Sequence, residues 1–149
     1  MPKIQSKTIE HHQDEIIAAF ATLADDREAM LDYLIDLGHT LAPMNPAYKT
    51  DAYLIPGCMS HVWLADIKAH GMLVFQADSN TAITKGLVSL LVKVLSVQPI
   101  HTIATAKLYF IETIGIQNLV GFQRANGFLH MMKEIKLRAL ARLHEHATT

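Results

Sequence analysis

The middle of this 149-residue chain reads VWLADIKAHGMLVFQA from residue 62 to residue 77, and the rest of the predicted fold is arranged around it. Its two halves, VWLADI and MLVFQA, are short and rich in β-branched and aromatic residues, which favours strands. The four residues 68–71 between them suit a hairpin connection. We therefore expect two antiparallel strands here and a third around residues 53–55, before the turn at residues 56–57.

Helical patterns precede this hairpin. Apolar residues at helical spacing predict a first helix with Thr8 as its cap. A second helix is expected to start near Asp25, with Glu28 three residues later in a capping-box arrangement, and to stop at Gly38. Two helices joined by so short a connection should lie antiparallel. The segment 39–48 carries two prolines and no periodicity, so it is predicted to be a loop.

More helices are expected after the hairpin. The polar run 78–80, Asp-Ser-Asn, offers caps for a third helix, and the segment 98–121 predicts two short helices. A long last helix should run from about Phe122 to His144. This order of elements predicts an α+β domain in which helices pack on one face of a small three-stranded antiparallel sheet. The apolar stripe predicted for the last helix is Ala125, Phe128, Leu129, Met132, Ile135 and Leu140.

Composition limits the class of protein. Half of the residues are hydrophobic and 18% are charged, as in globular chains, and we expect one domain over residues 1–149. The formal net charge of −1 argues against a nucleic-acid binder, which would need a basic face. The polar amino terminus lacks the apolar core of a signal peptide, and Lys85, Lys93 and Gln98 interrupt the longest apolar stretches, so no membrane span is expected. We predict a soluble cytoplasmic protein.

The chain has a single cysteine, Cys58, so no internal disulfide can form. Free cysteine usually behaves as a small buried hydrophobe, and this interpretation stays open. The position of Cys58 favours a functional role, because the residue follows Gly57 on a predicted turn. Loops held by a rigid scaffold are where reactive groups concentrate.

Three chemistries could use this thiol. A metal site is the weakest, since zinc needs about four ligands and the scattered histidines show no ligand spacing. A hydrolase nucleophile needs a base within hydrogen-bond reach, and His61 would project to the opposite face of an extended strand. Sulfur exchange needs an accessible thiol on a loop, and no base, metal or second cysteine. The residues fit sulfur exchange best.

The stretch PGCMSHVWL, residues 56–64, resembles the active-site loop of the SufE-type sulfur acceptors, whose pattern is G-C-x-S-x-V-W. Further segments are similar to the family's, in the same order, between about residues 12 and 140. These segments are YLIDLG at 33–38, YKT at 48–50, ADSNTAITKGL at 77–87 and FQRANGFLHMM at 122–132. The residues that match the loop pattern are Gly57, Cys58, Ser60, Val62 and Trp63.

The resemblance implies a sulfur carrier. Cys58 would accept persulfide sulfur from a pyridoxal-phosphate-dependent cysteine desulfurase, stimulate that enzyme, and pass the sulfur to an iron–sulfur assembly protein; no cofactor is implied in this chain itself. Gly57 and Ser60 would support the loop, and Asp78 and Arg124 would lie near it or contact the desulfurase. Asp78 could instead cap a helix, and Arg124 could be a solvated residue of a first helical turn.

The implied fold is that of SufE and of the IscU-type scaffolds on which clusters are built. A scaffold needs several cysteine ligands, so one cysteine indicates a carrier. The loop departs from the family at Met59 and His61, where relatives often have glutamine, so the residues do not identify the desulfurase. The apolar neighbours of Cys58 predict a thiol shielded in the free protein, and Arg124 is expected to pair with a partner carboxylate or with Asp78.

Two rival functions stay open at this point. The protein could regulate a desulfurase allosterically, with Cys58 incidental to that role. It could also be a cysteine-dependent hydrolase, which would require a histidine within reach of the Cys58 sulfur.

Overall fold

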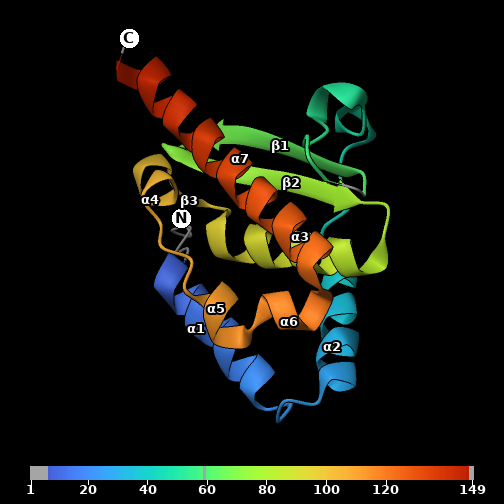
Figure 1. Cartoon of the computed structure of the whole chain (residues 1–149). Helices are drawn as coiled ribbons and strands as arrows, with labels where there is room; N and C mark the ends of the chain where they lie inside the picture. The colour runs from blue at the N-terminus through green and yellow to red at the C-terminus, as the bar shows by residue number, and fades with distance from the viewer. Residues whose placement is uncertain (1–6, 59, 148–149) are drawn as a thin grey trace.

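The computed structural model describes residues 7–58 and 60–147, with side chains to residue 145. The predicted hairpin is present. Strands β1 (Val62–Ala69) and β2 (Met72–Ser79) pair antiparallel over their full lengths (Figure 1). Their connection places His70 and Gly71 in the left-handed region, at φ values of 53° and 76°. Such backbone conformations are those that tight hairpin turns require.

The third strand lies elsewhere than predicted. Leu54 forms one isolated bridge with Trp63, and residues 53–55 form no strand. The sheet is completed instead by β3 (Gln98–Pro99), which pairs antiparallel with the other edge of β2. Two residues are too few to show the alternation that signals a strand, and proline cannot donate a ladder hydrogen bond. The three-stranded antiparallel sheet is thus confirmed, but its third member was misplaced.

Helices pack on one face of this sheet, as predicted. Leu64 of β1, Leu91 of α3 (Ala82–Leu95) and Ile135 of α7 (Phe122–Ala147) line one small apolar space between the three elements. The segment 98–121 holds three short helices where two were predicted. The other helices and 3-10 turns are α1 (Ile9–Ala21), α2 (Arg27–His39), η1 (Pro46–Tyr48), η2 (Asp51–Tyr53), α4 (Ile100–Ala104), α5 (Phe110–Ile114) and α6 (Ile116–Val120).

The first two helices begin close to their predicted starts. The Thr8 hydroxyl accepts a hydrogen bond from the His11 N–H at 3.0 Å and caps α1. The cap of α2 is Asp26, whose carboxylate accepts from the Ala29 N–H at 3.1 Å. Asp25, the predicted start, instead takes a left-handed conformation in the connection between the helices.

Gly38 packs α2 against α3. The helix ends one residue after it, at His39, close to the predicted stop. A Cβ on Gly38 would lie 2.9 Å from the backbone nitrogen of Gly86 in α3, and a Cβ on Gly86 would lie 2.4 Å from the carbonyl oxygen of Leu34. The two glycines therefore let the backbones of α2 and α3 approach more closely than any side chain would permit.

The predicted core-facing stripe of α7 is confirmed in part: Phe128 and Ile135 are buried, and Ala125 and Met132 pack half-buried against the core. Leu129 and Leu140 were expected inside, but they are 45% and 50% exposed. Arg138 donates to the Leu64 carbonyl at 2.7 Å, and other arginine contacts join this part of α7 to β1. No helix in the described part of the chain is long and apolar enough to cross a membrane. The buried residues of α7 are Phe128, Met131, Ile135 and Ala139.

Candidate active-site loop

Residues 56–58 and 60–61 belong to a loop whose two ends are attached to the sheet. At its start, the Ile55 N–H donates to the Val62 carbonyl at 2.9 Å. At its end, the His61 N–H donates to the side-chain oxygen of Asn80 at 3.0 Å, and the Asn80 N–H donates back to the His61 carbonyl at 3.2 Å. The loop therefore projects from a fixed base, as reactive loops commonly do.

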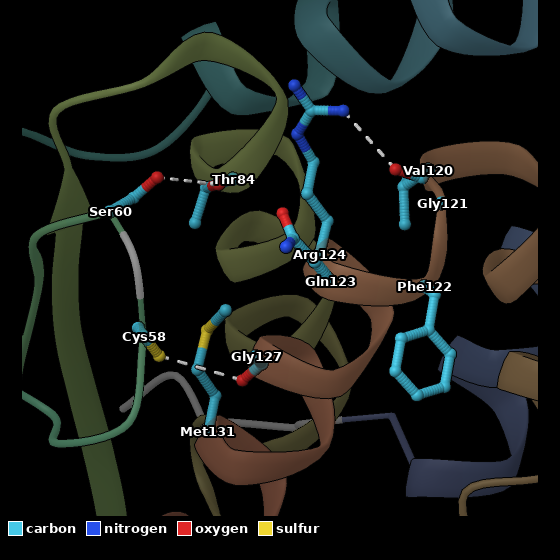
Figure 2. A pocket seen from close by; sticks show the side chains of 10 residues that line it. All are labelled: Cys58, Ser60, Thr84, Val120, Gly121, Phe122, Gln123, Arg124, Gly127 and Met131. Carbon is cyan, nitrogen blue, oxygen red and sulfur yellow. Dashed lines mark hydrogen bonds between the residues drawn. The ribbon is translucent and has the colours of Figure 1, made fainter.

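The thiol of Cys58 is half-buried between this loop and α7. Its S–H donates to the carbonyl oxygen of Gly127, with 3.6 Å between Sγ and the oxygen (Figure 2). Burial raises the pKa of the Cys58 thiol above its ordinary value, so the neutral thiol predominates at pH 7. This half-burial agrees only in part with the predicted shielding, because Cys58 also lines a cavity. Met59, whose apolar side chain entered that prediction, lies outside the described residues.

Gly57 lets the loop turn directly before Cys58. Its φ of 83° lies in the left-handed region, which side chains with a Cβ rarely adopt. A Cβ at this position would also lie 3.3 Å from Nδ1 of His130 on α7. Both the conformation and the close approach to α7 therefore favour glycine here.

A cavity of about 450 Å³ opens beside the thiol and is large enough for a small ligand or part of a partner chain. At one wall, Nη1 of Arg124 donates to the carbonyl oxygen of Val120 at 3.2 Å (Figure 2). At another, the Ser60 hydroxyl hydrogen-bonds the hydroxyls of Thr81 at 2.8 Å and Thr84 at 3.3 Å. The cavity thus combines polar groups with apolar lining from Val120, Phe122 and Met131.

Three predicted site residues line this one cavity: Cys58, Ser60 and Arg124. Two residues of α7 that contact the loop were not predicted. Gly127 accepts the hydrogen bond of the thiol, and His130 lies against Gly57. Both fall in the FQRANGFLHMM segment, where a glycine inside a long predicted helix was the available signal of a close approach.

Asp78 does not line the cavity and forms ion pairs with two lysines. Its carboxylate pairs with Nζ of Lys49 at 2.9 Å and with Nζ of Lys85 at 3.3 Å. Burial alone would raise the pKa of Asp78, but hydrogen bonds from Lys49, the next backbone N–H and Lys85 outweigh it and hold the pKa below its usual value. Asp78 does not cap α3, whose N-cap position is Thr81 and which has no side-chain capping hydrogen bond. The predicted pairing of Asp78 with Arg124 is also absent.

The arrangement around the thiol does not favour a hydrolase. The carbonyl oxygen bonded to Cys58 cannot accept its proton as a base would. The His61 ring lies instead against the Trp63 ring, with 5.8 Å between their centroids. Among residues 7–58 and 60–147, no histidine forms a hydrogen bond with the thiol, and no group of three or more His, Cys, Asp or Glu side chains could hold a metal ion.

Comparison with known proteins identifies the class. The SufE family profile, described as an Fe-S metabolism associated domain, matches residues 14–139. The chain belongs to the SufE family, which confirms the resemblance seen in the loop. Its role accordingly lies in iron–sulfur metabolism.

SufE-like proteins of plants and bacteria are similar to this chain. SufE-like protein 1, chloroplastic/mitochondrial, of Arabidopsis thaliana is 34% identical over 127 residues, which are 85% of this chain and 34% of that protein. An uncharacterized SufE-like protein of Rhizobium etli is 32% identical over 134 residues, 87% of this chain and 90% of that protein. The chain thus spans about a third of the plant relative's length. The cytoplasmic location of this chain stays a prediction.

A solved structure shares the fold. The solution structure of a hypothetical protein from Thermus thermophilus matches with a TM-score of 0.74, covering 89% of this chain and 96% of that one. The two sequences are 12% identical, so the likeness concerns the fold alone.

Proposed function

We propose that this protein is a sulfur carrier. Cys58 accepts persulfide sulfur from a pyridoxal-phosphate-dependent cysteine desulfurase, and the protein passes the sulfur to a partner in iron–sulfur cluster assembly. The observation that carries the proposal is the position of the chain's single thiol. Cys58 stands on a loop with a fixed base, beside a cavity of about 450 Å³ in which a partner's side chain can meet it.

The transfer is a thiol–persulfide exchange. The Cys58 sulfur attacks the outer sulfur of the enzyme's Cys–S–SH group, so that a new S–S bond forms at Cys58 and the S–S bond of the enzyme breaks. The enzyme's thiolate leaves and takes up the proton that Cys58 gives up. One thiol and one persulfide are consumed and one of each is formed, so the step needs no oxidant, metal or second cysteine.

The resting state of the loop suits this role. Half-burial keeps the thiol neutral, and a neutral thiol reacts slowly with stray oxidants and thiols. Docking of the desulfurase is expected to open the loop and break the hydrogen bond to Gly127. Removal of the persulfide returns the enzyme to its free thiol, and this is how the carrier would stimulate the desulfurase.

Mass spectrometry tests the proposal. After incubation with a cysteine desulfurase and free cysteine, the wild-type chain should be heavier by one sulfur atom, located on the peptide that contains Cys58. The Cys58→Ser variant should stay unmodified yet still bind the desulfurase, since a docking surface is larger than one side chain. If the wild-type chain gains no sulfur while Cys58→Ser stimulates the enzyme equally well, the protein is an allosteric regulator and not a carrier.

A further inference from the structure

The outer side of α7 carries large apolar side chains that are exposed. Figure 1 shows α7 running across the front of the molecule, with no other helix or strand drawn over it. We call these side chains the α7 stripe: Phe122, Leu129, Leu137 and Leu140, which are 72%, 45%, 50% and 50% exposed. At 3.6 residues per turn, these four residues fall within about 80° of the helix circumference and span about 27 Å along its axis.

The α7 stripe borders the loop that carries Cys58. Phe122, at one end of the stripe, also lines the cavity beside the thiol. Leu129 is followed by His130, whose ring lies close enough to Gly57 that a Cβ there would be 3.3 Å from Nδ1. A protein that lies along the stripe is therefore also next to the loop.

The charge at the centre of the stripe is positive. Lys133 is exposed one turn from Leu129 and one turn from Leu137. The two carboxylates of α7 are already engaged, because Glu134 pairs with an arginine at 3.2 Å and Glu145 with another at 3.5 Å. Within the described part of the chain, no carboxylate forms an ion pair with Lys133. An occupant of the stripe should therefore present an acidic group at this point.

We propose that the α7 stripe is a docking surface for an amphipathic helix of the desulfurase, which places an apolar ridge on the leucines and a carboxylate opposite Lys133. This inference rests on the proposed function, because its occupant is the protein that delivers sulfur to Cys58. The apolar ridge supplies affinity and the single charge pair fixes the register, as in other helix recognition.

Two other occupants fit less well. A second copy, packed antiparallel so that Leu129 meets the other copy's Leu137, would bring the two Lys133 side chains together, and like charges opposed in this way are unfavourable. An anionic membrane would match the charge. A membrane, however, has no need to reach Cys58, whereas a desulfurase must reach it, and the stripe lies next to the Cys58 loop.

To test this surface, the dissociation constant of each variant is measured with a purified cysteine desulfurase that binds the wild-type protein. The double variant Leu129→Gln/Leu137→Gln removes apolar area and keeps residues of good helix propensity. Lys133→Glu reverses the central charge, and Lys107→Glu, at an exposed position outside the stripe, is the matched control. The dissociation constant should rise tenfold or more in the first two variants and less than twofold in the control. Sulfur transfer at saturating enzyme should stay within twofold of wild type.

The outcomes separate the two proposals. Unchanged affinity in both stripe variants, with Cys58 still loaded, would overturn the docking surface and leave the carrier function standing. A wild-type protein that binds but is never loaded would count against the carrier function alone. Sedimentation velocity and flotation with phosphatidylglycerol vesicles test the other occupants. A wild-type dimer, or vesicle binding, that the double variant abolishes would overturn the assignment to the desulfurase.

Discussion

The sulfur of Cys58 lies 3.6 Å from the carbonyl oxygen of Gly127, so the loop and α7 meet at the one thiol of the chain. The thiol donates and the carbonyl accepts, and a bond of this kind favours the protonated form. Burial acts in the same direction, since it raises the pKa of the thiol. Because the thiolate is the nucleophile, the contact describes a resting state of low reactivity.

Alkylation of the free protein should accordingly be slow at neutral pH. Because the folded-state pKa of Cys58 is raised, its contribution to stability is present below the unfolded pKa and is lost as pH rises through the folded one. Rates with iodoacetamide, measured against pH for the folded protein and for the protein in urea, should give a higher midpoint for the folded protein. Rapid labelling of the folded protein at pH 7 would contradict the shielded resting state.

Replacing Gly57 and Gly71 by alanine, one at a time, should distinguish the effect of backbone strain from the effect of moving the Cys58 thiol. Gly57 and Gly71 have φ values of 83° and 76°, so alanine at either should destabilise the fold by about 1–2 kcal/mol. A Cβ at Gly71 meets nothing within 4 Å, whereas a Cβ at Gly57 meets the His130 ring at 3.3 Å. Urea unfolding should show similar losses for the two variants. Only Gly57→Ala should slow sulfur transfer severalfold, and equal transfer rates would argue against a positioning role for Gly57.

Local signals account for what the sequence predicted of the fold. The β1–β2 hairpin and the start of α1 could be predicted because alternation, turn residues and a cap lie within a few positions of one another. Strand β3 and the contact of Gly38 with Gly86 join segments distant in the chain, and no local pattern marks them. Gly38 was predicted to stop α2, which ends one residue later at His39, but nothing local to Gly38 showed that it also packs against α3.

In the candidate site, too, residues in local motifs could be predicted and contacts between distant residues could not. Cys58 and Ser60 could be identified from their loop motif, and Arg124 from a second motif. Gly127 could not be assigned, because its contact with Cys58 joins residues 69 positions apart. Asp78 was predicted from its motif to lie near the Cys58 loop or to contact the desulfurase. Its partners Lys49 and Lys85 lie 29 residues before it and 7 residues after it, so the loop motif gave no sign of these ion pairs.

Asp78→Asn should reduce stability and leave sulfur transfer near the wild-type rate. The change removes the charge that pairs with Lys49 and Lys85, and we expect a loss of about 1–3 kcal/mol at pH 7. Because the pKa of Asp78 is lowered, its contribution is present above the ordinary carboxyl pKa and is lost as pH falls through the folded value. Urea unfolding at several pH values should show the two proteins converging in acid.

The converse result for Asp78 would be informative. A variant as stable as wild type at pH 7 but slow in sulfur transfer would make Asp78 a contact of the desulfurase and not a structural anchor. Lys85→Met, which removes one ion pair and keeps the side-chain length, is the matched control for stability, since it should reproduce part of the loss.

Arg124→Ala should weaken sulfur transfer while the fold stays intact. One nitrogen of the guanidinium donates to the Val120 carbonyl at the end of α6, and the remaining donors are available to a partner carboxylate at the cavity. Loss of the single bond to Val120 should lower the free energy of unfolding by about 1 kcal/mol. We expect the effect on transfer to appear as a higher dissociation constant for the desulfurase, and to be larger at low salt.

Two neighbouring variants make the test of Arg124 specific. Gln123→Ala changes an uncharged side chain of the same cavity wall and should leave transfer nearly unchanged. Arg124→Lys keeps the charge but loses the planar pair of donors, so it should fall between wild type and alanine. Arg124→Ala could instead transfer sulfur at the wild-type rate and lose a measurable amount of stability. This result would limit Arg124 to its hydrogen bond with Val120, which joins α6 to α7 and contributes to folding but not to binding of the desulfurase.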